Sequence, residues 1–278
     1  MTDQLQSHRW LVDGTRITPP PEWIALRQRV DELAAMQRLN LWRLIQAVIT
    51  GDGDLPTLKA LAVAEVYPSD VVDQVNAAAH DELSRLYEPV AQRNYRTLAA
   101  KFDDAAKRFT ACCSRVDVSA VPAEIIDANS KALQAWKDAA VIATELEDLV
   151  MQLGCTAELC GMPSDLFAMT FDNNTALIPL TVDTTNLHRR KLWQAWHSTD
   201  GRCRRWGPLA DLGAKIRAAS DPAAVALFPP PAETGVRFEY TESGFKSVPF
   251  DPEDPENHTG PVSKLVNAIT GRAEEFPS

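Results

Sequence analysis

The sequence predicts a mainly α-helical fold, in which an elongated helical bundle or hairpin precedes a small α+β region with one β-hairpin. Apolar residues recur every three or four positions through most of residues 22–153, as they do on one face of a helix. Alternation of apolar and polar residues, typical of a strand, follows at residues 236–241. We therefore expect a long-helix bundle over residues 1–153 and an interaction region over residues 154–278, with an acidic linker and a short C-terminal helix.

The composition is that of a soluble globular protein. Of the 278 residues, 45% are hydrophobic and 24% are charged, which excludes wholesale disorder and collagen-like architectures. The formal net charge of −10 argues against a protein that coats nucleic acid with its whole surface. No apolar stretch approaches the ~20 residues that cross a bilayer, no secretory signal opens the chain, and the five cysteines form no disulfide framework. We expect no membrane partner and a cytoplasmic location, or incorporation into an assembly formed in the cytoplasm.

The first predicted helix covers residues 22–50. Three prolines precede it, where a missing N–H has no intrahelical partner, and Gly51 supplies a C-terminal stop. Its apolar positions from Trp23 to Val48 trace one face of a helix, and Gln37 and Asn40 interrupt this stripe, so we expect a gap in burial there. A turn then leads to a short helix over residues 56–66.

Two longer helical stripes follow. The first runs over residues 71–116 behind Ser69, a natural N-cap, and contains Pro89, which predicts a kink or a break. A connector leads to the second stripe, over residues 133–153, for which Gly154 is the predicted stop. Two long amphipathic helices joined by a short linker are expected to form an antiparallel hairpin.

Shorter elements are expected beyond Gly154. Short helical turns are predicted for residues 155–170 and a polar turn for residues 171–175. Pro179 makes residues 176–182 an edge strand or a loop, because proline cannot donate to a sheet ladder. The remaining predictions are helices over 186–197 and 208–219, a β-hairpin of strands 236–241 and 245–250, a solvated acidic linker over 251–257, and a last helix over 262–269.

The charge distribution is most uneven in residues 188–217. This segment holds eight Lys and Arg against two acids, a net charge of +6, so that the rest of the chain carries −16. Three of the seven tryptophans also lie there, and arginine beside aromatic planes suits an acidic protein partner or nucleic acid. The candidate binding residues are Arg189, Arg190, Lys191, Trp193, Trp196, Arg202, Arg204, Arg205 and Trp206.

Three interpretations of this basic segment stay open. Leu192, Trp193 and Trp196 can form the buried stripe of a helix whose other face is a solvated basic surface. The segment can instead bind a protein partner or another part of the chain, and the acidic remainder of a neighbouring identical subunit is an obvious partner. Contact with nucleic acid is the third interpretation.

Few residues point to catalysis or to metal binding. Cys203 is flanked by two arginines, whose charge can lower the pKa of a thiol, and His197 could act as its base. The spacing of the two matches no cysteine-hydrolase signature. Cys155 and Cys160 lack the second pair of ligands that a structural zinc site needs, and no phosphate-binding glycine loop, Gly-x-Ser-x-Gly or His-Glu-x-x-His motif occurs. We expect no catalytic residue, no metal site and no cofactor.

The leading hypothesis is a non-enzymatic structural or interaction protein, a subunit of a larger homomeric assembly such as a viral particle. Its motivation is a set of long helices without a local active-site motif. The first alternative is a nucleic-acid-associated protein that uses residues 188–217. The second alternative is an enzyme with a site centred on Cys203 and His197.

Overall fold

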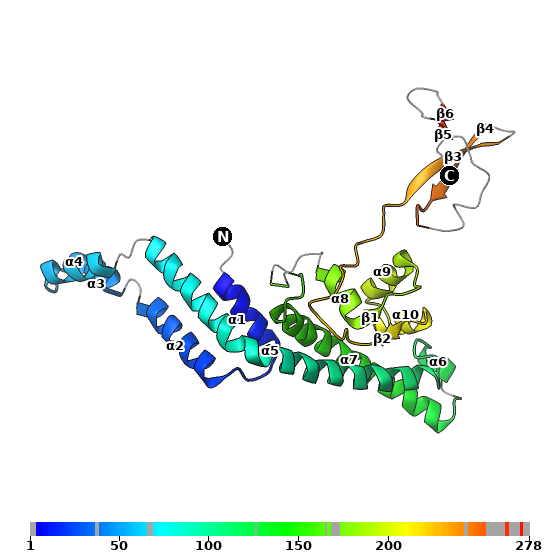
Figure 1. Ribbon diagram of the computed structural model, residues 1–278, viewed down its shortest axis with the longest axis horizontal. Helices are drawn as coiled ribbons and strands as arrows, with labels where there is room; N and C mark the ends of the chain where they lie inside the picture. The colour runs from blue at the N-terminus through cyan, green and yellow to red at the C-terminus, as the bar shows by residue number, and fades with distance from the viewer. Residues whose placement is uncertain are drawn as a thin grey trace.

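The computed structural model is mainly α-helical, which confirms the predicted fold class (Figure 1). It describes residues 4–36, 39–65, 69–125, 127–164, 166–167, 173–241, 244–253, 265–266 and 273–274. Within these ranges, no helix combines the length and the apolarity that crossing a membrane requires.

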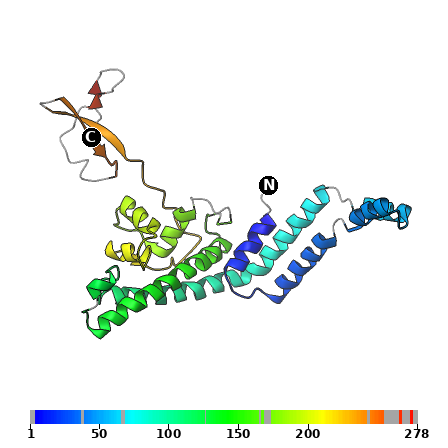
Figure 2. The ribbon, with the colours of Figure 1, turned by 180° about the vertical axis from the view of Figure 1, so that it is seen from behind.

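A hairpin of two long helices forms the centre of the molecule. Helix α5 (Ser69–Cys113) and helix α7 (Ser130–Leu159) run antiparallel and side by side, joined through the short helix α6 (Pro122–Ile125) (Figures 1 and 2). Phe102 and Phe109 of α5 are fully buried against Leu146 and Leu153 of α7. The predicted antiparallel hairpin is confirmed.

The predicted stop at Gly154 is wrong, because α7 continues through this residue to Leu159. A Cβ atom at Gly154 would lie 2.8 Å from Cδ2 of Leu177 and 3.0 Å from Cδ1 of Leu166. The glycine therefore permits close packing of the next segments on α7 rather than a change of chain direction. The short turns predicted from residue 155 onward accordingly begin only after α7 ends.

Pro89 does not break α5, which is one helix of 45 residues. Figures 1 and 2 show that α5 changes direction along its length. An interior proline removes one backbone hydrogen bond and its ring clashes with the preceding turn, which bends a helix without ending it when both halves are packed. Here the first half packs on α1 and α2, and the second half packs on α7.

Two helices cover the first half of α5. Leu5 and Val12 of α1 (Gln4–Gly14) and Trp23 of α2 (Pro21–Met36) are buried with Leu83 and Tyr87 of α5. These residues form a second hydrophobic core, smaller than the core between α5 and α7.

The single helix predicted for residues 22–50 is wrong, since this stretch contains α2 and α3 (Leu39–Thr50). The physical reason is that the stripe has two different partners. Trp23 faces α1 and α5, whereas α3 packs on α4 (Leu55–Glu65), the short helix that the sequence predicted. The side chain of Asp54 caps α4 by accepting hydrogen bonds from the N–H and the hydroxyl of Thr57.

Residues 173–181 form helix α8 (Asn173–Thr181), so the predicted edge strand or loop is wrong for residues 176–181, and only Val182 of that stretch lies in a strand. Pro179 cannot donate to the carbonyl of Thr175 one turn earlier. That carbonyl accepts instead from the N–H of Phe228 at 2.7 Å, which satisfies the group that the proline leaves open. The polar turn predicted for residues 171–175 falls partly outside the described residues.

The next elements are shorter than predicted. Helix α9 (Arg189–His197) begins after Asn186, which has a left-handed φ of 63°, and helix α10 (Trp206–Asp211) ends before Gly213, with a φ of 69°. Strand β1 (Val182–Asp183) then pairs antiparallel with β2 (Lys215–Ile216). This pairing replaces the second half of the helix predicted for residues 208–219.

The predicted β-hairpin is confirmed. Strand β3 (Gly235–Thr241) pairs antiparallel with β4 (Gly244–Phe250), with Val236 opposite Pro249. Further on, β5 (Leu265–Val266) pairs with β6 (Ala273–Glu274), so the helix predicted for residues 262–269 is wrong where it is described. The rest of that prediction lies outside the described residues.

The main core crosses the predicted domain boundary at residue 153. One cluster of buried residues joins Phe102 and Leu153 to Leu177 and Trp206. Helices α8, α9 and α10 therefore share a hydrophobic core with the long hairpin. The division of the chain into two domains stays a prediction.

Candidate interaction surfaces

The three tryptophans of the basic segment lie in the core. Trp193, Trp196 and Trp206 expose 5%, 1% and 0% of their surface. The indole N–H of Trp193 donates to the carbonyl of Pro229 at 2.9 Å, and that of Trp196 donates to Oδ1 of Asn174 at 2.8 Å. Leu192 is buried as well, so the interpretation as a buried helical stripe fits α9. None of the three indoles offers an exposed face on which a base could stack.

Most of the candidate arginines have partners within the chain. The guanidinium of Arg202 lies 3.2 Å from the ring centroid of Trp136 and donates to its carbonyl. Arg205 pairs with Glu147 at 2.8 Å and lies over the ring of Trp196. The acidic partner of Arg205 thus belongs to the same chain.

The first turn of α9 has acidic partners of its own. Arg189 pairs with Glu253, and Arg190 pairs with Asp251. The described part of the acidic linker, residues 251–253, is therefore docked on α9 rather than solvated, which corrects that prediction. Of the candidate residues, Lys191 and Arg204 are exposed and make no ion pair with any residue in the described ranges.

Cys203 does not have the environment of an activated nucleophile. It is 2% exposed, and burial raises the pKa of its thiol. The positive charge of Arg202 lowers this pKa, but by less than burial raises it. Its Sγ lies 3.8 Å from the carbonyl oxygen of Val118. His197 stacks on the ring of Trp193, with 5.0 Å between centroids. The lowered thiol pKa that an enzyme centred on Cys203 would need is not found, because desolvation outweighs the charge of Arg202.

The other thiols are no better suited to chemistry. All five cysteines are free, and burial raises the pKa of each, to about 12 for Cys155 and about 11 for Cys160. In the part of the chain that the structure describes, no three His, Cys, Asp or Glu side chains gather as ligands for a metal ion.

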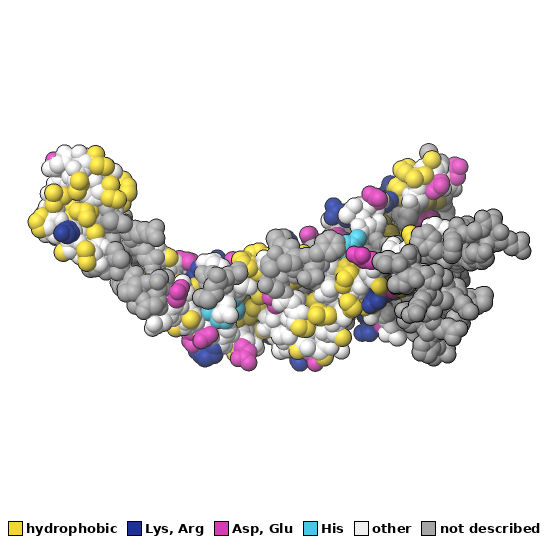
Figure 3. Space-filling model, turned by 90° about the horizontal axis from the view of Figure 1, so that it is seen from above, with side chains coloured by type: hydrophobic (Ala, Val, Ile, Leu, Met, Phe, Trp, Pro, Cys, Tyr) yellow, Lys and Arg dark blue, Asp and Glu magenta, His cyan; other side chains and the backbone are white. Residues whose placement is uncertain are grey.

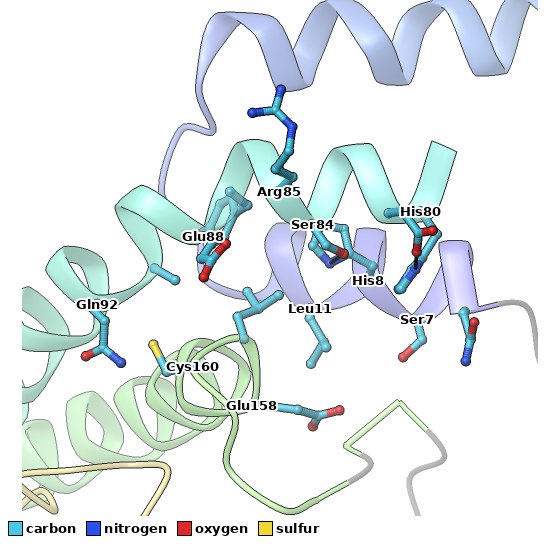
Figure 4. Close-up of a pocket in the computed structure, with 15 residues that line it drawn as sticks. Ser7, His8, Leu11, His80, Ser84, Arg85, Glu88, Gln92, Glu158 and Cys160 are labelled. Carbon is cyan, nitrogen blue, oxygen red and sulfur yellow. Dashed lines mark hydrogen bonds and ion pairs between the residues drawn. The ribbon is translucent and has the colours of Figure 1, made fainter. Parts of the chain in front are cut away.

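A groove of about 760 Å³ lies between α1, α5 and the end of α7 (Figure 4). His8 in its wall has a pKa of about 4, lowered mainly by burial and further by the neighbouring charge of His80. Its Nε2 accepts from the indole N–H of Trp23 at 3.3 Å, and its Nδ1 lies 3.4 Å from Oγ of Ser84. Both ring nitrogens are engaged in holding the helices together, so His8 has a structural role here.

Among the residues whose exposure is described, many of the exposed large apolar side chains lie elsewhere, on α3 and α4. We call residues 39–65 the α3–α4 tip, which stands at one end of the molecule (Figure 1). Figure 3 shows hydrophobic side chains gathered over it. The exposed apolar side chains of the tip are Trp42 (62%), Ile45 (47%), Val48 (64%), Ile49 (71%), Leu55 (42%), Leu61 (44%) and Val63 (65%).

The tip exposes these side chains because one helix cannot cover the apolar arc of another. At ~100° per residue, the apolar side chains of α3 from Ala47 round to Trp42 span more than half of its circumference. Ala47 is buried against α4, and Ala62 of α4 is buried in turn. Trp42 and Ile49 point away from that contact and have no neighbour to cover them among the described residues.

Sequence reasoning missed this surface because it assigned the stripe from Trp23 to Val48 to one buried face. Two features of the sequence indicate this exposed apolar surface. The apolar arc of residues 41–49 is wider than a single partner helix needs, and the tip carries only two basic and three acidic residues.

Comparison with known proteins adds no relative, since no protein-family model, no curated protein and no solved structure matches the chain.

Proposed function

We propose that the protein is a non-enzymatic interaction protein, a subunit of a homomeric assembly in which the α3–α4 tip joins one copy to another. The observation that carries this proposal is the exposed apolar surface of the tip. Monomeric proteins rarely expose contiguous apolar patches larger than a few hundred Å², and larger patches mark contacts with other molecules. The cytoplasmic location and the larger, particle-like assembly expected from the sequence are parts of the same proposal.

The geometry of the tip favours a second copy as its partner. Each tip is a pair of helices that leaves apolar side chains of both helices exposed, and two such pairs can close a four-helix bundle by two-fold symmetry. Trp42 and Ile49 of one copy would pack between the helices of the other. Aromatic side chains of this kind dominate the energy of protein interfaces.

The net charge and the exposed apolar area of the tip are both compatible with a second copy as its partner. The tip has a net charge of −1, although the whole chain carries −10, so two tips meet with little repulsion. The exposed apolar area of the tip is of the order of several hundred Å², comparable with the ~800 Å² that each partner buries in a standard interface.

The alternatives have less support. The nucleic-acid hypothesis needs exposed aromatic rings among the basic residues, whereas Trp193, Trp196 and Trp206 are buried. The enzyme hypothesis needs a reactive thiol at Cys203, whereas burial raises the pKa of that thiol.

Sedimentation velocity over a range of concentrations tests the proposal. We expect the average mass of the full chain to rise with concentration, because the tips associate. The double substitution Trp42→Glu with Ile49→Glu places charge on the apolar face and should leave a monomer at every concentration. Val141→Glu on α7 is the matched control, since Val141 is 70% exposed but lies outside the tip.

Two results would contradict the proposal: a wild-type chain that stays monomeric at all concentrations, or a double variant that associates like the wild type. Far-UV circular dichroism of each variant checks that loss of association is not loss of helix.

A further inference from the structure

The first turn of α9 meets a segment that lies about sixty residues further along the chain. We propose that this turn is a binding site for a peptide with two carboxylates two residues apart, and that residues 251–253 of the same chain occupy it. The sequence of this segment is Asp-Pro-Glu. The proposal does not depend on association through the α3–α4 tip.

Arg190 binds the first carboxylate with two donors on one edge of its guanidinium. Its Nη2 donates to Oδ1 of Asp251 at 2.8 Å, and its Nε donates to Oδ2. The same Nη2 donates to the carbonyl of Ala232 at 2.6 Å. The planar fork of arginine matches the two oxygens of a carboxylate, and such paired contacts are both stronger and more selective than a single one.

The second carboxylate has its own set of donors. Oε1 of Glu253 accepts from Arg189 and, at 2.6 Å, from the backbone N–H of Ala232. The backbone carbonyl of Glu253 lies 3.1 Å from Nε2 of His188. Within the segment, the N–H of Glu253 donates to Oδ1 of Asp251 at 2.9 Å, which fixes the two carboxylates relative to each other.

The position of the arginines in α9 explains why the site needs an anion. The N-terminal end of a helix carries a partial positive charge, so two arginines in the first turn are unfavourable without a negative partner. His188, the N-cap residue, makes no side-chain capping bond. Hydrogen bonds from Arg190 and Arg189 lower the pKa of Asp251 and of Glu253, respectively, because they stabilise the ionised carboxylates.

Occupation of the site also holds the β-hairpin to the helices. Ala232 precedes β3, residues 251–253 follow β4, and both contact Arg190. Figure 1 shows β3 and β4 away from the long hairpin, beyond an extended stretch of chain. The site therefore fixes the base of the β-hairpin, and a competing acidic peptide would release it.

The sequence around the site determines which peptide should bind to it and which acids must be removed to empty it. Residues 254–256 repeat Asp-Pro-Glu directly after the docked copy. A peptide containing Asp-Pro-Glu-Asp-Pro-Glu is therefore the matching ligand. A variant that empties the site must remove the acids of both copies, so that the second cannot replace the first.

The test measures binding of this labelled peptide to full-length variants by fluorescence anisotropy. The emptied variant carries Asp251→Asn, Glu253→Gln, Asp254→Asn and Glu256→Gln. We expect saturable binding to it, at least tenfold weaker binding to the wild type, and weakening as salt rises. Adding Arg190→Gln should reduce binding at least tenfold, whereas Arg217→Gln, which removes an ion pair with Asp183 outside the site, should not.

Failure of the emptied variant to bind the peptide would overturn the proposal. Equal binding of a peptide in which Asn and Gln replace the acids would also overturn it, as would unchanged binding after Arg190→Gln. A second measurement uses hydrogen exchange at the N–H of Ala232, which donates to Glu253. We expect faster exchange in the emptied variant, and an unchanged rate would show that the carboxylates do not hold the segment.

Discussion

Two tryptophans of this chain have opposite roles because their surroundings differ. Trp196 is 1% exposed, donates its indole N–H to Asn174 and contacts the ring of Trp206 edge to face. Trp42 is 62% exposed and lies on the open face of the α3–α4 tip. The sequence context predicts Trp196 as a binding residue and passes over Trp42, because only burial distinguishes a residue that stabilises the fold from one whose surface is open to a partner.

This difference predicts the effect of truncating each ring. Trp196→Ala should lower the free energy of unfolding by about 3–5 kcal/mol, because it leaves a cavity and removes the hydrogen bond that the indole donates to Oδ1 of Asn174. Trp42→Ala should change it by less than about 0.5 kcal/mol at a concentration where the chain is monomeric. Urea denaturation of the two variants measures both values. Equal effects would mean that Trp196 is not part of the core.

The buried His8 predicts how stability depends on pH. Burial, and then the charge of His80, lowers its pKa from 6.5 to about 4 in the folded chain. Between these values the unfolded chain binds a proton that the folded chain does not, so stability is lost as pH falls from about 6.5 to about 4. The loss from this residue is at most about 3 kcal/mol.

Urea denaturation at a series of pH values tests the role of His8. His8→Gln removes the titrating group while leaving an acceptor for Trp23, so it should flatten the pH dependence over this window. A variant with the same slope as the wild type would show that other groups cause the loss.

Helix periodicity predicts the helices of this protein better than it predicts their partners. The apolar stripes of α5 and α7 predict the hairpin, because each stripe is so long that only another long helix can bury it. The stripe from Trp23 to Val48 has the same period, yet it is divided between α2 and α3, which bury against different helices. A period identifies an apolar face, and only the tertiary structure shows what covers it.

Proline and glycine were misleading for a related reason. Pro179 suggested a strand edge or loop, but α8 tolerates it because the N–H of Phe228 satisfies the carbonyl of Thr175. Gly154 suggested a helix end, but it lies inside α7, where the neighbouring leucines leave no room for a Cβ atom. Both effects come from residues distant in sequence, which local patterns do not contain.

The N-terminal cap of α7 predicts how much one capping side chain contributes to the stability of the chain. The side chain of Asn129 accepts a hydrogen bond from the N–H of Ala132 at 2.9 Å. Asn129→Ala should lower the free energy of unfolding by about 1 kcal/mol, because the N–H loses its partner, whereas Asn129→Asp should retain the cap. Urea denaturation compares the two. If both variants were as stable as the wild type, the cap would contribute nothing to the hairpin.

At the scale of the whole molecule, the two contact surfaces are separated along its length. The α3–α4 tip stands at one end, next to the start of α5, and the acidic-peptide site on α9 lies toward the other end (Figure 1). A helix of 45 residues such as α5 is about 68 Å long at ~1.5 Å per residue. This separation means that pairing of two tips leaves the rest of each molecule free for further contacts.

Pairing of two tips brings the same position of two copies together, which energy transfer between copies labelled at that position can detect. Thr50→Cys places a label at the end of α3, and Ser114→Cys places one just beyond the far end of α5; both positions are exposed, whereas the five native cysteines are buried or half-buried. Mixing donor-labelled and acceptor-labelled chains should give transfer at Thr50→Cys, loss of that transfer with Trp42→Glu and Ile49→Glu, and no transfer at Ser114→Cys. Absence of transfer at the tip, in a mixture that sedimentation shows to be associated, would contradict the account.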